Sequence, residues 1–194
     1  MISWTVRGLR RAGVFEGIVV AVPAGWSERA RRILGAGNHL KIVTGGRTRQ
    51  DSVGNALKAL PPACRLVAVH DAARPFASPS LIRRIVRAAH ATGAAIPALP
   101  IEDTVKRVNV GGDVVATVPR ETLTRVQTPQ AARRDLLDRA HARARRRRVQ
   151  ATDESALLEG IGVRVRTVPG DAANIKITTP GDLKRAGRLL AARR

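Results

Sequence analysis

The sequence predicts a single α/β domain built around a doubly wound, mostly parallel sheet. Through the first hundred residues, short apolar runs that suit buried strands alternate with amphipathic stretches that suit helices. The chain has 194 residues, of which 44% are hydrophobic, so it is long and apolar enough to form one core. It contains no G-x-G-x-x-G and no G-x-x-x-x-G-K-[ST] motif, so neither a dinucleotide fingerprint nor a P-loop is predicted.

The first half of the chain predicts strands and helices in alternation. Continuous apolar runs predict strands at residues 17–22, 40–43, 66–69 and 94–99. Apolar residues at helical spacing predict helices at residues 2–13, 27–34, 53–60 and 80–91. Ser27 is expected to cap the second of these helices. Because crossovers between parallel strands are right-handed, the loops that follow the strands are expected to meet at one edge of the sheet.

The pattern changes after Pro100. Residues 103–108 and 114–118 flank Gly111-Gly112-Asp113 and predict a hairpin that mixes polar and apolar residues. Such a hairpin is either an arm that pairs with another subunit or an ordinary surface excursion, and periodicity alone favours neither.

The last third of the chain returns to alternating elements. It predicts a basic helix at residues 131–146, a short helix at 152–159, strands at 163–168 and 174–177, and a final helix. The start of that helix carries a capping pattern, with Thr179 as cap, Pro180 at the first position and Asp182 three residues after the cap.

Chemistry-bearing residues follow several of the predicted strands. Asp71 and Arg74 come directly after the strand at 66–69, and Lys176 ends the strand predicted at 174–177. Gly46 and Ser52 lie between a strand and a helix, where a glycine lets the backbone approach a ligand. Each signal is weak alone, but an acid suits a metal and an arginine suits a phosphate. Their common edge predicts a site that handles phosphates.

The composition restricts the environment and the partners. The chain carries 35 Lys and Arg against 15 Asp and Glu, a net charge of +20, so its surface attracts polyanions. Either nucleic acid or a phosphorylated small molecule suits that charge, but the run at 143–148 is more typical of a solvated helix face. With only two Trp, two Phe and no Tyr, stacking on single strands is not indicated. The lone Cys64 excludes an intrachain disulfide and fits a reducing cytosol, and no run is long enough for a membrane span.

A set of motifs covers most of the chain. In chain order they are Gly45-Gly46 with Asp51-Ser52-Val53, Val69 to Pro75, Asp103-Thr104 with Lys106-Arg107, Gln127-Thr128-Pro129-Gln130, Thr152-Asp153-Glu154, and Asn174-Ile175-Lys176-Ile177-Thr178. Together they resemble the 2-C-methyl-D-erythritol 4-phosphate cytidylyltransferases of the non-mevalonate isoprenoid pathway. The resemblance implies a Rossmann-like sheet of the nucleotide-diphospho-sugar transferase type, a cytoplasmic location and a Mg²⁺ cofactor. It also implies that methylerythritol phosphate attacks CTP to form CDP-methylerythritol and pyrophosphate.

The resemblance also assigns roles to residues. The residues implied to hold the substrate phosphate during catalysis are Arg120 and Lys176. Those implied to contact CTP are Gly46, Ser52, Asp71 and Ala72, with Asp71 also binding the metal. Those implied to line the substrate pocket are Thr104, Arg74 and Thr128. Residues 99–121 correspond to an arm that clasps a second subunit, so the resemblance implies a homodimer whose sites are shared.

The resemblance also implies a strand and a glycine-rich loop, with an arginine and a lysine, ahead of the first helix. We expect the 194 residues without that segment to be an incomplete domain with unpaired strand edges and to turn over CTP very poorly. The alternatives are a related ribitol-phosphate cytidylyltransferase, a basic nucleic-acid-binding protein, which the composition makes the weaker choice, and a catalytically inactive dimeric scaffold.

Overall fold

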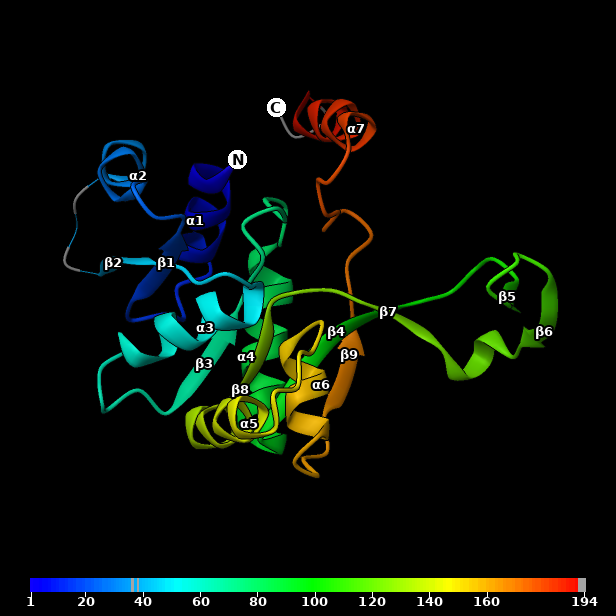
Figure 1. Ribbon diagram of the computed structural model, residues 1–194. Coiled ribbons are helices and arrows are strands. Elements are labelled where there is room, and N and C mark those ends of the chain that lie inside the picture. Colours follow the sequence, from blue (N-terminus) through cyan, green and yellow to red (C-terminus); the bar gives the residue numbers. More distant parts are fainter. Residues whose placement is uncertain (36, 38, 192–194) are drawn as a thin grey trace.

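The computed structural model describes residues 1–35, 37 and 39–191 and shows an α/β fold (Figure 1). Its larger sheet has five strands, which are β3 (Leu66–Val69), β8 (Gln130–Arg133), β4 (Ala94–Pro100), β7 (Thr124–Val126) and β9 (Arg166–Pro169). The strand β8 runs antiparallel to both β3 and β4, β7 runs antiparallel to β4, and β9 runs parallel to β4. The predicted α/β class is confirmed, while the sheet is mixed rather than mostly parallel.

Two further strands form a separate parallel pair, β1 (Ile18–Val22) with β2 (Leu40–Thr44). A cavity of about 490 Å³ lies between β1 and β3, and both strands line it together with residues of α1 (Ile2–Arg11) and α3 (Arg49–Lys58). Among the described strands, β1 pairs only with β2, and β3 pairs only with β8. Each of these two strands therefore has one edge outside any ladder of the described residues.

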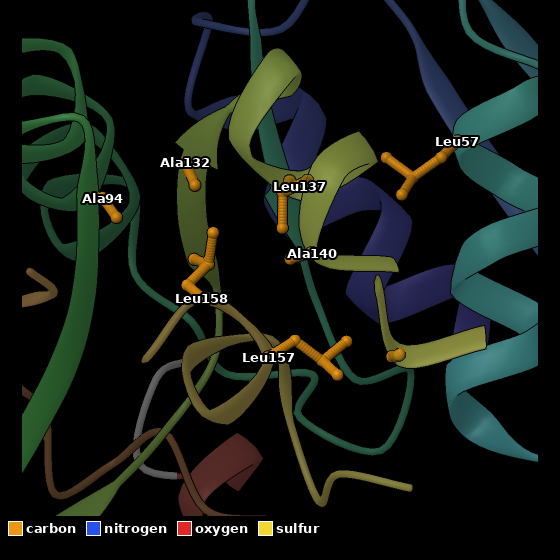
Figure 2. Close-up of a cluster of buried hydrophobic side chains, with 8 residues drawn as sticks. Leu57, Ala94, Ala132, Leu137, Ala140, Leu157 and Leu158 are labelled. Atoms are coloured by element: carbon orange, nitrogen blue, oxygen red, sulfur yellow. The ribbon is translucent and has the colours of Figure 1, made fainter. Parts of the chain in front are cut away.

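Helices cover both faces of the larger sheet, and the alternation of side chains along its strands separates the two faces. On one face, Ala95 and Ala131 pack against α4 (Pro79–Thr92). On the other face, Ala94 and Ala132 join a cluster with Leu57 of α3 and with leucines of α5 (Arg134–Arg147) and α6 (Glu154–Glu159), drawn in Figure 2. Small residues at these four positions let the helices lie close to the sheet.

The structure corrects two predictions around the strands. The helix predicted at 131–146 begins at Arg134, because residues 130–133 form β8 between β3 and β4. The strand predicted at 174–177 is absent, and those residues form a loop in which the buried amide of Asn174 donates to the carbonyl of Thr128 at 2.8 Å. Side-chain hydrogen bonds replace a backbone ladder there.

Helix starts and strand ends differ at a few positions. Ser27 is the first residue of α2 (Ser27–Leu34) rather than its cap, because Trp26 occupies the cap position without a side-chain hydrogen bond. The strand predicted at 163–168 is shorter and begins at Arg166 as β9. The capping pattern of α7 (Pro180–Ala191) is confirmed, since Asp182 N donates to Thr179 Oγ1 at 3.1 Å and the Asp182 carboxylate accepts from Thr179 N at 2.9 Å.

The predicted hairpin is present as β5 (Val105–Val108) and β6 (Val114–Val118), which pair antiparallel. In Figure 1 it projects to one side, away from the body of the molecule, on two extended segments. Its apolar side chains are exposed at Val108, Val110, Val114 and Val115. Among the described residues, no helix combines the length and the apolar character that crossing a bilayer requires.

Candidate active site

Asp71 lies in the turn that follows β3 and is surrounded by positive charge. Its Oδ2 is 3.2 Å from Lys176 Nζ and 3.9 Å from Arg74 Nε, and its Oδ1 accepts a hydrogen bond of 3.0 Å from Arg49 Nε. Burial alone raises the pKa of Asp71, but the charges of Arg49 and Lys176 outweigh burial and hold that pKa below its ordinary value. Asp71 is therefore ionised at neutral pH.

The loop that carries Lys176 is tied to the Asp71 turn. The carbonyl of Asn174 accepts a hydrogen bond of 2.8 Å from Arg74 Nη1, and Ile177 N donates to the carbonyl of Ala73 at 2.8 Å. Asn174 itself is fully buried. These contacts bring Lys176 and Asp71 together although the predicted strand at 174–177 does not form.

A chain of hydrogen bonds orients the backbone of Asp71. Its N–H donates to Thr128 Oγ1 at 3.0 Å, and Thr128 Oγ1 lies 2.9 Å from His70 Nδ1. Because His70 Nε2 lies 3.0 Å from the carbonyl of Arg74, that nitrogen carries the proton, and Nδ1 accepts from the Thr128 hydroxyl. Burial lowers the pKa of His70 to about 4, so its ring is neutral at pH 7.

The Gly45-Gly46 segment precedes the capped start of α3. Gly46 N donates to Ser52 Oγ at 3.0 Å, and Thr48 and Asp51 form a capping box. A Cβ on Gly46 would lie 2.2 Å from Asp51 Cβ, so only glycine fits without a shift of the backbone. The segment therefore brings bare backbone close to the N-terminal end of α3, where the helix dipole attracts anions.

The role of Arg49 is not predicted by the sequence pattern. Its Nη1 donates to Glu154 Oε1 at 3.0 Å, and its Nη2 lies 2.9 Å from Glu154 Oε2, while its Nε contacts Asp71. The available signal was the position of Glu154 on the same helical face as Leu157 and Leu158, because an acid on an apolar face requires a buried partner.

Arg120 and Thr104 belong to the arm and lie apart from this cluster. The guanidinium of Arg120 donates to the carbonyl of Glu102 and pairs with Glu121 at 4.0 Å. Within the described part of the chain, no hydrogen bond or ion pair joins Arg120 or Thr104 to Asp71 or to Lys176. One copy of the chain thus assembles most of the predicted site, and the two arm residues remain outside it.

The remaining predicted residues lie near the cluster. Ala72 lines the cavity beside Asp71, and its carbonyl accepts a hydrogen bond of 2.8 Å from Thr5 Oγ1. Ser52 and Lys176 line the same cavity. The edge therefore offers the ionised Asp71, the cations Arg49, Arg74 and Lys176, and a glycine loop. This arrangement suits a polyphosphate and a divalent cation.

Comparisons with known proteins identify the family. Residues 1–192 match the family described as "IspD: 2-C-methyl-D-erythritol 4-phosphate cytidylyltransferase". The enzyme of that name from Solibacter usitatus is 45% identical over 94% of this chain and 77% of its own length. A bifunctional IspD/IspF enzyme from Anaeromyxobacter dehalogenans is also 45% identical, and this chain spans 49% of it.

Solved structures give the same result. The cytidylyltransferase from Thermus thermophilus is 39% identical with a TM-score of 0.83, over 96% of this chain and 86% of its own. The 4-diphosphocytidyl-2C-methyl-D-erythritol synthase from Anaerococcus prevotii is 30% identical with a TM-score of 0.91, over 98% of this chain and 88% of its own. The chain therefore belongs to the 2-C-methyl-D-erythritol 4-phosphate cytidylyltransferase family.

Proposed function

We propose that this chain forms CDP-methylerythritol and pyrophosphate from CTP and 2-C-methyl-D-erythritol 4-phosphate. The observation that carries the proposal is the cluster of Lys176, Asp71 and Arg74 at the end of β3, in a chain that belongs to a cytidylyltransferase family. In this reaction a phosphate oxygen bonds to the α-phosphorus of CTP, and the bond from that phosphorus to the pyrophosphate oxygen breaks. Two anions must approach each other, so neutralisation and positioning dominate the catalysis.

The cations at the edge suit the phosphates of the two substrates. Lys176 is half exposed and is free to exchange its contact with Asp71 for one with a phosphate. Arg74 is largely buried, and its Nε has no hydrogen-bond partner among the described residues. A buried donor without a partner is costly, and a phosphate oxygen of the substrate would satisfy it.

Asp71 is the residue that would hold Mg²⁺. The described residues contain no group of three or more His, Cys, Asp or Glu side chains suited to a metal. One carboxylate at this edge fits Mg²⁺, which commonly takes one or two carboxylates and completes its shell with phosphates and waters. When bound, the ion would neutralise charge on the triphosphate.

The arm supplies a second part of the proposal. Arg120 and Thr104 lie outside the cluster within one copy, and the arm between them exposes Val110, Val114 and Val115. An exposed hairpin with apolar side chains suits pairing with another chain. We infer a homodimer in which the arm of one copy brings Arg120 and Thr104 to the site of the other.

The test is a comparison of two lysines. Lys176→Ala is expected to lower the rate of CDP-methylerythritol formation by about 100-fold, because a charged ligand of a reacting phosphate is removed. Lys184→Ala, on the exposed face of α7, is the matched control and is expected to keep the rate of the unmodified chain. Equal rates for Lys176→Ala and the unmodified chain would contradict the proposed site.

A further inference from the structure

Arg49 joins two carboxylates of different accessibility. Its two terminal nitrogens contact the carboxylate of Glu154 at 3.0 and 2.9 Å, and its Nε donates to Asp71 Oδ1 at 3.0 Å. The side chain of Glu154 is only 2% exposed, whereas that of Asp71 is 13% exposed. The guanidinium thus links a buried acid to an acid that opens onto the site.

Stability alone does not explain why the carboxylate of Glu154 is buried. Glu154 lies at the start of α6, and the next turn of that helix contributes Leu157 and Leu158 to the core. Moving a carboxylate out of water costs several kcal/mol, and a buried pair commonly stabilises a fold no better than apolar residues of similar size. Removing only one of the two partners would destabilise the fold, but the stability of the fold does not explain why the pair as a whole is present.

The geometry supplies that reason. A guanidinium is planar, so one hydrogen bond from Nη1 to Glu154 Oε1 and one ion-pair contact of Nη2 with Oε2 restrict the plane and the direction of the Nε–H bond of Arg49. That bond then holds Oδ1 of Asp71 and leaves Oδ2 directed at Lys176, 3.2 Å away. The backbone N–H of Asp71 is held independently by Thr128. Both the backbone and the carboxylate plane of Asp71 are therefore fixed.

We propose that Arg49 and Glu154 are positioning residues that hold the carboxylate of Asp71 in the orientation required to bind CTP and its Mg²⁺. The inference rests on the proposed function, because Asp71 is the group through which the two residues act. Neither Arg49 nor Glu154 needs to touch a substrate. A lysine at position 49 would keep the charge, but it would lose the planar pair of contacts that sets the direction.

A purely structural role is the competing explanation, because the ion pair also ties α3 to α6. The two explanations differ in their coupling to Asp71. If the pair acts through Asp71, its removal has little further effect once the Asp71 carboxylate is gone. If the pair only supports the fold, the effect of removing the pair and the effect of removing the Asp71 carboxylate multiply.

The experiment is a double-mutant cycle of Glu154→Gln and Asp71→Asn, measured as the affinity for Mg·CTP by calorimetry and as kcat and KM. Glu154→Gln nearly preserves the shape of the side chain. We expect it to weaken Mg·CTP binding and lower kcat by about 10- to 100-fold, the loss that a small misplacement of a reacting group causes. The KM for methylerythritol phosphate is expected to stay within about twofold. In the Asp71→Asn background, the same substitution is expected to change CTP affinity by less than about twofold.

Two further variants complete the cycle. Arg49→Lys is expected to behave like Glu154→Gln, and it replaces that variant if Glu154→Gln does not fold. Asp138→Asn removes an exposed ion pair with Arg134 on α5 and is expected to leave every parameter unchanged.

The contradicting outcomes are distinct for the two proposals. Wild-type kcat and CTP affinity in Glu154→Gln, or full multiplication of the effects in the double variant, would overturn the positioning role. If the unmodified chain neither binds Mg·CTP nor forms product, the proposed function fails instead. In that case the same cycle is measured as the free energy of chemical unfolding, which still tests the coupling between Glu154 and Asp71. An absence of coupling would overturn the positioning role.

Discussion

At the scale of single residues, the site depends on charges that are buried to different degrees. Asp71 is ionised because Arg49 and Lys176 outweigh the effect of its burial, whereas burial raises the pKa of Glu154 despite the contact with Arg49. The pKa of Arg49 is raised, since its two acids outweigh the lowering effect of burial. Arg49 thus stays charged between the two carboxylates, which favours one fixed arrangement of the three groups.

The position of Asp71 and Arg74 could be predicted, because both follow β3 at the carboxyl edge of the sheet. Lys176 meets Asp71 there for another reason, since its loop is tied to the Asp71 turn by hydrogen bonds rather than by a strand. The link from Arg49 to Glu154 spans more than a hundred residues, and helical periodicity does not say which buried acid meets which base. Asp153 behaves as an acid before a helix normally does: it caps α6, and its carboxylate accepts a hydrogen bond from Ala156 N at 2.9 Å. The neighbouring Glu154 also lies at the start of α6, but its side chain is buried and contacts Arg49 instead.

His70 makes stability depend on pH. Its pKa is about 4 in the folded chain and about 6.5 when unfolded, so the unfolded state binds more protons as the pH falls between these values. The contribution of neutral His70 is fully present above pH 6.5 and decreases as the pH falls towards 4. We expect the free energy of unfolding to drop by on the order of 2 kcal/mol more in the wild type than in His70→Gln between pH 7 and pH 4.5. Urea unfolding at both pH values measures this, and equal drops in the two proteins would show that His70 is not buried in its neutral form.

At the scale of elements, the clearest error concerned β8. Its two central residues are alanines, which carry little strand propensity and continue smoothly into the helical pattern of α5. Burial between β3 and β4 decides their conformation, and this is a tertiary effect that local sequence does not encode. By contrast, strands with β-branched residues, such as Val19 and Val20 of β1, were predicted correctly.

The separation of β1 and β2 from the larger sheet leads to a prediction about local stability. The cavity beside β1 removes packing on one side, whereas β8 is paired on both edges and covered on both faces. We expect the amide hydrogens of β2 and β1 to exchange at least about tenfold faster than those of β8, because regions with fewer packed contacts open more easily. Hydrogen exchange followed by mass spectrometry measures the difference. Equal protection of the β1–β2 pair and of β8 would mean that the cavity does not divide the fold into parts of different stability.

At the scale of the whole molecule, the exposed arm is the part of the chain that we propose pairs with a second copy. The exposed valines of β6 give a direct test, because charges at Val114 and Val115 would disfavour an apolar interface. We expect the double variant Val114→Lys, Val115→Lys to shift the chain from dimer to monomer in light scattering and to lower the rate of product formation. Leu183→Lys, at an exposed position of α7, is the control and is expected to remain dimeric. A monomeric unmodified chain, or a double variant that stays dimeric, would contradict the role of the arm.

The most direct test of the proposed function is product formation by the unmodified chain with Mg²⁺, CTP and methylerythritol phosphate, followed over hours by chromatography. We expect CDP-methylerythritol and pyrophosphate to form in equal amounts, and only when both substrates are present. Pyrophosphate release without methylerythritol phosphate, or an absence of product together with an absence of CTP binding, would contradict the proposal that this edge of the sheet is a cytidylyltransferase site.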